Sequence, residues 1–416
     1  MIEQKSNDSQ NLPQKQCAIC INCGKCQKGS AKPDRLFHSA ISLIQQQPTG
    51  ARYANYLAVA DIGTTTLAFV LYDNFGRMVD HTTSLNPQVS YGGDVMSRIL
   101  AAQNPNAAGI MKKMITVLIL QAMQRFAQIT TQSISLVIAA NTVMTYLLMG
   151  WDVKELGQSP YLCARMQEEL LQGEIRFQSE SINGVVMPGF SAFIGGDIYA
   201  GILATNMERQ KEWSLLIDLG TNGEMVLGNQ NKLWAVSVAA GSAFDTTDLW
   251  GTQKTELIAQ LLLKKLIDPT GALADPWFHM GIQVGGATIT QKEIRSLQLS
   301  KAAVRAGLDL LFHTVGSIPE DQVEHVVLAG GFGYHLQPSS AVGIGMLSAT
   351  LARKATAMGN TALAGGYLFG RRRQLLGVQD MMRSYQHLSN RISTLPLAEF
   401  PEFEQTYLSH LNFPSS

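Results

Sequence analysis

Two copies of one strand–turn–strand pattern constrain the fold more than any other feature of this sequence. In residues 57–73, and again from residue 215, an apolar run ends in an aspartate, Asp61 or Asp218, and a Gly-Thr turn follows at once. An apolar run bounded by glycines predicts a buried strand that ends in a tight turn. A duplicated unit of this kind predicts two similar lobes that face each other across a shared phosphate group.

The residues of both turns suit an anionic ligand. Glycine lets a backbone approach its ligand closely, and the amides of a turn can point at a phosphate. Asp61 and Asp218, each at a strand end, are placed to hold Mg²⁺ through water. The predicted phosphate-binding residues are Gly63, Thr64, Thr65 and Thr66 in the first turn, and Gly220, Thr221, Asn222 and Gly223 in the second.

A third glycine turn follows the apolar run of residues 326–329 and carries no carboxylate, which suits a backbone that packs against a nucleoside. The ordered trio of turns resembles the phosphate-1, phosphate-2 and adenosine motifs of the acetate and sugar kinase/Hsp70/actin (ASKHA) superfamily. This resemblance implies an α/β fold of two RNase-H-like lobes, as in actin-like ATPases, with ATP and Mg²⁺ in the cleft. It places Gly330, Gly331 and Gly333 against the nucleotide.

The Gly-Gly-Asp turn that ends at Asp197 precedes a small-residue helix just upstream of the second phosphate turn. In kinases of the superfamily a Gly-Asp here supplies the general base, so the resemblance implies that Asp197 activates water in an ATPase, beside Asp61 and Asp218. The structural alternative for Asp197 is a helix N-cap. Asp94 also has two interpretations: it caps a helix that carries Arg98 on its solvated face, or it belongs to a loop that lies over the cleft.

Four cysteines, Cys17, Cys20, Cys23 and Cys26, form an evenly spaced C-x2-C-x2-C-x2-C run. Zinc sites usually separate two close pairs by a long loop. Even C-x2-C-x2-C spacing is typical of [4Fe–4S] ferredoxins. We therefore expect an iron–sulfur cluster, with [4Fe–4S] favoured and zinc as the alternative. The fifth cysteine, Cys163, is expected to be an ordinary buried thiol.

Further motifs narrow the resemblance: Asn86-Pro-Gln with Tyr-Gly-x-Asp94-Val-x-Ser-Arg-Ile, Asn141-Thr-x-Met, Ile194-Gly-Gly-Asp-Ile-x-Ala-Gly, and Asp218-x-Gly-Thr-Asn-Gly-Glu. Together they are similar to the ASKHA domain of the reductive activators of corrinoid-dependent enzymes. The resemblance implies an iron–sulfur protein that couples ATP to one-electron reduction of a Co(II) corrinoid to Co(I). The implied partners are a corrinoid protein or corrinoid-dependent methyltransferase and a low-potential electron donor. The stretch after Phe244 is shorter than the family pattern, which leaves ATP hydrolysis itself open.

Two other functions fit part of the pattern. One is the related activator ATPase of 2-hydroxyacyl-CoA dehydratases, although four crowded cysteines in one chain argue against a cluster shared by two subunits. The other is a zinc-stabilised ASKHA regulator that binds ATP without redox activity. The identity of the metal separates these functions. The oligomeric state is not set by the sequence, and a homodimer is one expectation.

Composition and charge indicate which partners and which compartment to expect for the protein. Lys+Arg and Asp+Glu number 32 each among 416 residues, so no overall field favours nucleic acid or an acidic membrane. No apolar run spans a membrane and no signal peptide is evident, so a cytoplasmic protein is expected. The expected organisation is a disordered tail (1–16), a cysteine-rich segment (17–30), a linker (31–54) and an ASKHA domain (55–416). Within that domain, we expect a first lobe at about 55–210, a second at about 211–370 and a C-terminal segment at 371–416.

Overall fold

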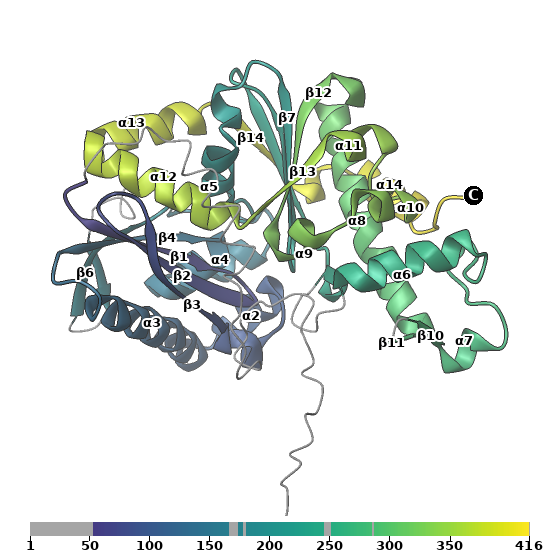
Figure 1. Ribbon diagram of the computed structural model, residues 1–416, viewed down its shortest axis with the longest axis horizontal. Coiled ribbons are helices and arrows are strands. Elements are labelled where there is room, and N and C mark those ends of the chain that lie inside the picture. Colours follow the sequence, from purple (N-terminus) through teal and green to yellow (C-terminus); the bar gives the residue numbers. More distant parts are fainter. Residues whose placement is uncertain (1–52, 166–173, 178–179, 245–250, 285–286, 416) are drawn as a thin grey trace, which may run out of the picture.

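The structure, a computed structural model, describes residues 53–165, 174–177, 180–244, 251–284 and 287–415 (Figure 1). The four-cysteine run, the tail before it, nearly all of the linker, and the stretch directly after Phe244 lie outside the described residues. The described chain forms two α/β lobes, each built on a six-stranded sheet.

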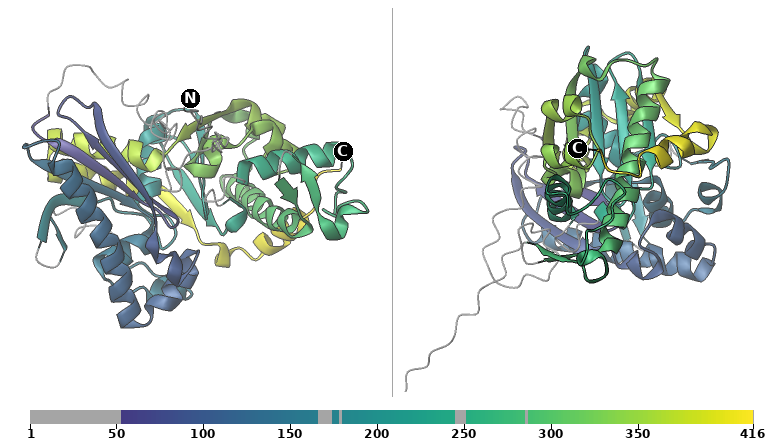
Figure 2. Two further views of the ribbon diagram at one scale, coloured as in Figure 1. Left: turned by 60° about the horizontal axis from the view of Figure 1, so that its bottom comes forward. Right: turned by 90° about the vertical axis from the view of Figure 1, so that its right-hand side faces the viewer.

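The first lobe carries a sheet of order β3-β2-β1-β4-β6-β5. Its strands are β1 (Tyr56–Ile62), β2 (Thr66–Tyr72), β3 (Met78–Leu85), β4 (Ile134–Ala140), β5 (Glu174–Phe177) and β6 (Glu180–Val186). The first three strands form an antiparallel meander, and β4 lies parallel to β1. Helices α2 (Val95–Ala102), α3 (Pro105–Ala127) and α4 (Thr142–Met149) pack on the outer face, as the turned views of Figure 2 also show for α3.

The second lobe repeats this arrangement in the order β13-β12-β7-β8-β9-β14. Its strands are β7 (Trp213–Leu219), β8 (Gly223–Gly228), β9 (Leu233–Val238), β12 (Val323–Ala329), β13 (Ala355–Gly359) and β14 (Ile392–Leu395). Strands β7, β8 and β9 form the same meander, and β12 lies parallel to β7 as β4 does to β1. The prediction of two similar α/β lobes, each opened by an Asp-Gly-Thr hairpin, is therefore confirmed.

The second lobe also contains further helices and a separate two-stranded sheet. They are α6 (Gly251–Leu263), α7 (Trp277–Met280), β10 (Ile282–Val284), β11 (Ala287–Ile289), α8 (Gln291–Thr314), α9 (Gly330–His335), α10 (Pro338–Gly343), α11 (Ala349–Lys354) and α14 (Glu402–Ser409). Helix α8 packs on strands β8 and β9, α6 packs on α9 and α10 within the same apolar core, and α14 packs on α8. In the described part of the chain, no helix is both long and apolar enough to cross a membrane.

Two helices join the lobes from the inside. Helices α5 (Gly196–Thr205) and α12 (Thr361–Leu376) pack on each other, and one core cluster includes Leu57 and Val59 of the first sheet with Leu216 and Val226 of the second. The helices approach so closely that a Cβ on Gly365 would lie 1.8 Å from the carbonyl oxygen of Ala200. Both lobes therefore share one buried core behind the cleft.

The C-terminal segment corrects one expectation about charge. Arginine side chains mostly lie at the protein surface, but Arg371, in the arginine run at 371–373, is only 3% exposed. Its guanidinium donates to the carbonyl oxygens of Asn55 and Asp73 and lies over the ring of Tyr53. Arg371 is buried because it satisfies backbone acceptors where the chain enters the first sheet.

Candidate functional site

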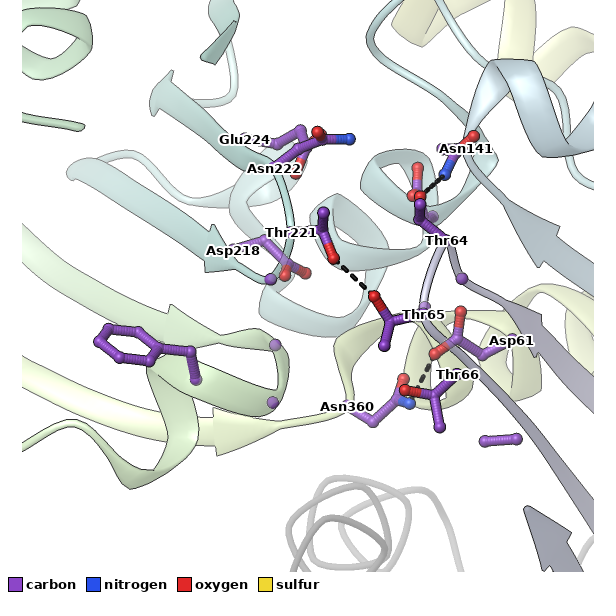
Figure 3. Close-up of a pocket in the computed structure, with 18 of the residues that line it drawn as sticks. Asp61, Thr64, Thr65, Thr66, Asn141, Asp218, Thr221, Asn222, Glu224 and Asn360 are labelled. Atoms are coloured by element: carbon purple, nitrogen blue, oxygen red, sulfur yellow. Dashed lines mark hydrogen bonds between the residues drawn. The ribbon is translucent and has the colours of Figure 1, made fainter. Parts of the chain in front are cut away.

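Most of the catalytic and nucleotide-binding residues predicted from the sequence line one cleft between the lobes (Figure 3). Hairpin β1–β2 supplies one wall and hairpin β7–β8 the facing wall. The hydroxyls of Thr65 and Thr221 lie 2.7 Å apart across the gap. The lining residues are Asp61, Gly63, Thr64, Thr65, Thr66, Ala68, Thr83, Asn141, Asp197, Asp218, Gly220, Thr221, Asn222, Glu224, Phe244, Gly330, Gly331, Phe332, Asn360, Thr361 and Ala362.

Two side chains hold the first turn from behind by donating hydrogen bonds to its carbonyl groups. The carbonyl of Gly63 accepts from the side-chain amide of Asn86 at 2.8 Å, and the carbonyl of Thr64 accepts from Nη2 of Arg98 at 2.5 Å. In a trans peptide the N–H of the next residue points opposite to the carbonyl. The amides of Thr64 and Thr65 therefore face away from Asn86 and Arg98, toward the cleft, as an anion site requires.

Arg98 contradicts the expectation of a solvated helix face. Asp94 does cap α2 and accepts from the amide of Ser97, but Arg98 is fully buried. Besides Thr64, its guanidinium donates to the carbonyl of Gly92 at 3.0 Å and to Oε1 of Gln88 at 3.2 Å. The side chain turns inward because these acceptors behind the turn need a donor. Burial lowers the pKa of Arg98 to about 10.

The other two turns approach the cleft from the second lobe. Gly220 donates to the carbonyl of Asn222 at 2.9 Å and closes the second turn. Gly330 has a positive φ of 77°, and a Cβ there would lie 2.4 Å from Oδ1 of Asp218. Only glycine allows this approach.

Two predicted glycines do not line the cleft. Gly223 begins β8, where a Cβ would lie 3.1 Å from Cγ2 of Val238. Gly333 lies in α9, and its nearest neighbours belong to Ile217, Leu219 and Leu328. Both therefore stand behind the wall, where they allow close packing of the turns.

Four carboxyl groups converge on the cleft, from Asp61, Asp197, Asp218 and Glu224. Burial raises the pKa of Asp61 and of Asp218 to about 7, and the other aspartates add to the rise. Burial also raises the pKa of Asp197 to about 6, against the amide of Ile198, which donates to it. The pKa of Glu224 is raised well above its usual range by burial, and then by Asp197 and Asp218.

This set of carboxyl groups fits a hydrated divalent cation. The cleft-lining residues include no lysine or arginine, so nothing on the lining balances the negative charge. Carboxylate oxygens are the ligands that Mg²⁺ prefers, and Mg²⁺ usually keeps several of its waters. Among the described residues, no three His, Cys, Asp or Glu side chains are arranged to hold a metal. An ion that keeps its waters would suit the carboxylates of the cleft.

Several cleft residues were not predicted from the sequence. Asn141 and Asn360 each cap a helix with the side-chain oxygen and direct the amide into the cleft. The amide of Asn141 donates to Oγ1 of Thr64 at 3.1 Å, and that of Asn360 donates to Asp61 at 2.7 Å. An asparagine between a strand and a helix was the available signal for both. Glu224 is the last residue of the second motif, and nothing else in the sequence marked it as a cleft residue.

Two α/β lobes with paired Asp-Gly-Thr hairpins and a glycine turn on one cleft define an ASKHA-type fold. Within that class, residues 56–210 match the family described as the RACo middle region. Residues 212–253 and 249–416 match the C-terminal domain of RACo, the ASKHA domain. The chain belongs to the RACo family, so the predicted resemblance to reductive activators of corrinoid-dependent enzymes is confirmed.

Two known proteins illustrate the relationship. The corrinoid activation enzyme RamQ of Eubacterium limosum is 28% identical over 422 aligned positions, which cover 85% of this chain and 69% of RamQ. A solved structure described as a reductive activator for corrinoid, iron–sulfur protein superposes with a TM-score of 0.74 at 24% identity. It covers 88% of this chain and 67% of that one. The second likeness concerns the fold alone.

Proposed function

We propose that this chain is an ATP-dependent reductive activator that delivers an electron to a Co(II) corrinoid protein or corrinoid-dependent methyltransferase. The observation that carries the proposal is the cleft, in which turns from both lobes and four carboxyl groups meet in a member of the RACo family. The similarity to RamQ, which is described as a corrinoid activation enzyme, supports the same function.

In this proposal the cleft residues divide the work on ATP. The amides of Thr64 and Thr65 and the turn from Gly220 to Asn222 hold the phosphates. Asp61, Asp218 and Glu224 hold hydrated Mg²⁺, which neutralises charge on the phosphates when it is bound. Gly330 and Gly331 pass beside the nucleoside.

Asp197 is the proposed general base. It lies in the first turn of α5 and lines the cleft, where it can accept a proton from the attacking water. Its pKa of about 6 leaves the carboxylate largely ionised near neutral pH, as a base requires. The N-cap role considered from the sequence falls instead to Gly195.

The electron path is proposed from the sequence. Cys17, Cys20, Cys23 and Cys26 would hold an iron–sulfur cluster, [4Fe–4S] in preference to zinc, which supplies one-electron transfer when bound. A low-potential donor would reduce it, and ATP turnover would change the angle between the lobes and the affinity for the corrinoid partner.

The test combines metal analysis with corrinoid reduction. The protein is prepared without oxygen, its iron, zinc and acid-labile sulfide are measured, and EPR spectra are recorded after dithionite reduction. Absorbance spectroscopy then follows the reduction of a Co(II) corrinoid protein with and without Mg·ATP. We expect iron with sulfide, and a Co(I) signal only when Mg·ATP is present.

Two variants and one control sharpen this test. Cys20→Ser with Cys23→Ser should lose iron, sulfide and corrinoid reduction together. Asp218→Asn should keep its iron and sulfide but give no Co(I) signal even when Mg·ATP is present. Cys163→Ser is the matched control, since this thiol pairs with the hydroxyl of Tyr146 and should change neither result. Zinc without sulfide in the wild type would overturn the electron-transfer role and leave a regulator that binds ATP.

A further inference from the structure

Four arginines from separate elements surround a second hollow, which we call the arginine pocket. They are Arg209 of η4 (Met207–Arg209), Arg372 of α12, Arg383 of α13 (Val378–Ser389) and Arg391 before β14. The hollow measures about 540 Å³, within the range of small-ligand sites and larger than one phosphate or carboxylate needs. None of its lining residues lines the nucleotide cleft.

The arginine pocket carries an excess of positive charge. Glu208 is the one carboxylate on its lining, and Arg383 pairs with Asp380 three residues earlier. Arg391 uses its guanidinium on the backbone carbonyls of His387 and Glu208. Four guanidinium groups therefore face two carboxylates, in a chain whose total charges balance. The excess is local to this hollow and favours an anionic ligand.

Arg209 and Arg372 keep hydrogen-bond donors that Glu208 does not use. Its side chain is 8% exposed, and its Oε1 lies 3.6 Å from Nε of Arg209 and from Nη1 of Arg372. Both contacts are ion pairs, and both distances exceed the length of a hydrogen bond. Within the described residues, neither carboxyl oxygen of Glu208 accepts a hydrogen bond. Arg209 and Arg372 can therefore give hydrogen bonds to an incoming carboxylate.

One side of the arginine pocket carries exposed apolar side chains. Leu376, at the end of α12, is 55% exposed and lines the hollow, and its neighbour Leu375 is 63% exposed. Exposed leucines beside arginines suit a ligand that carries both carboxylates and apolar side chains. A free inorganic anion would leave these leucines in water.

We propose that the arginine pocket docks an acidic segment of a partner protein, with carboxylates on the arginines and an apolar side chain over Leu376. Arginine is the residue best suited to this role, because its planar fork binds a carboxylate through two parallel hydrogen bonds. The identity of that partner as the corrinoid protein rests on the function proposed above.

The position of the arginine pocket connects docking to the nucleotide cleft. Leu203 of α5 and Arg372 of α12 line the pocket, while Asp197 at the start of α5 and Thr361 at the start of α12 line the cleft. In Figure 1, α12 and α13 lie side by side in yellow-green above the first sheet. A docked segment would therefore contact the same pair of helices that positions cleft residues.

The test uses the full chain and a defined probe. A fluorescent peptide that alternates glutamate with leucine is titrated with the protein, and its anisotropy is measured. A peptide of lysine and leucine and one of glutamate and serine serve as charge and apolar controls. We expect binding of the glutamate–leucine peptide, weaker binding of the glutamate–serine peptide and none of the lysine peptide.

Charge reversal locates the site. Arg209→Glu with Arg383→Glu should weaken binding of the glutamate–leucine peptide by at least about tenfold. These two side chains are 65% and 74% exposed, so the fold should tolerate the change. Arg353→Glu on α11 is the matched control, because this arginine is also exposed and lies outside the arginine pocket. It should alter the dissociation constant by less than about twofold.

Other outcomes overturn the docking proposal. They are an unbound glutamate–leucine peptide, equal binding by the double reversal variant, or full competition by inorganic phosphate with no preference for leucine over serine. The last outcome would indicate a simple anion site. Peptide binding by the Cys20→Ser/Cys23→Ser variant should equal that of wild type, so a failure of the electron-transfer proposal is read separately from a failure of docking.

Discussion

At the scale of single residues, the carboxyl groups of the cleft make stability depend on pH. The pKa of Asp61 and of Asp218 is about 7 in the folded chain, against an ordinary value of 3.8. As pH rises between these values, the unfolded ensemble loses the protons first. The free energy of unfolding of metal-free protein therefore falls with rising pH and levels off above about 7.

This pH dependence gives a first prediction, measured by thermal unfolding in the presence of EDTA. The Tm of metal-free protein should decrease from about pH 5 to about pH 8, and Asp218→Asn should flatten the decrease. Mg²⁺ binds ionised carboxylates, so its stabilising effect should be larger at about pH 8 than at about pH 6. A metal-free Tm that rises across this interval would contradict the raised pKa of both aspartates.

Arg98 gives a second prediction, because one side chain supports the first phosphate turn. Arg98→Met leaves the carbonyls of Gly92 and Thr64 and the side chain of Gln88 without this donor. The free energy of unfolding should fall by about 3 kcal/mol, less whatever is gained by removing a buried charge. Nucleotide affinity should fall as well, because the turn loses its support.

Urea unfolding and nucleotide titration measure both effects of the Arg98 substitution. Exposed Arg353→Met is the control and should stay within about 0.5 kcal/mol of wild type. Equal stability of the two variants would show that the guanidinium of Arg98 does not hold the turn.

Residue-scale prediction from the sequence depends on a local signal. The aspartates and threonines of both hairpins line one cleft, and each hairpin could be recognised because an apolar run, an aspartate and a glycine turn lie within a few residues. Their roles toward a nucleotide stay predictions. The simpler interpretation of Arg98 was wrong, because the sequence around Gln88 and Gly92 does not show that this side chain also reaches the turn at Thr64. Glu224 was overlooked because only the fold brings it near Asp197.

At the scale of elements, the contact between α5 and α12 sets how the lobes join. Alanine normally stabilises a helix by about 1 kcal/mol relative to glycine. At Gly365 the opposite should occur, because the added Cβ would lie 1.8 Å from the carbonyl oxygen of Ala200. Gly365→Ala should therefore lower the free energy of unfolding by at least about 2 kcal/mol.

Gly109, in the exposed part of α3, offers the matched control for this third prediction. A Cβ there meets nothing within 4 Å, so Gly109→Ala should stabilise the chain by about 1 kcal/mol. Denaturant midpoints of the two variants should move in opposite directions. A shift of both midpoints to higher denaturant would mean that α5 and α12 separate at little cost.

Elements close in sequence were easier to predict than contacts between distant ones. Strand β4 (Ile134–Ala140) and helix α3 (Pro105–Ala127) each coincide with a local apolar pattern in the sequence. Hydrophobic periodicity marks such elements directly. The parallel pairing of β14 with β9 and the close approach of Gly365 to Ala200 join segments far apart in sequence, and no local pattern encodes such pairings.

At the scale of the whole molecule, one cleft is shared by two lobes that already touch. The hydroxyls of Thr65 and Thr221 join the hairpin tips, and the cluster around α5 and α12 joins the sheets behind them. A nucleotide in the cleft would contact both hairpins at once. Its binding energy should therefore stabilise the two lobes together and not one alone.

Hydrogen–deuterium exchange measures this fourth prediction. Mg·ATP should slow exchange at least about tenfold in peptides that cover β1–β2 and in those that cover β7–β8, with little change in the exposed outer turns of α3. Asp218→Asn alters the second lobe alone, yet it should remove protection from β1–β2 as well, because the weakened nucleotide spans both walls. Protection confined to one hairpin would place the nucleotide on a single lobe and would contradict a shared cleft.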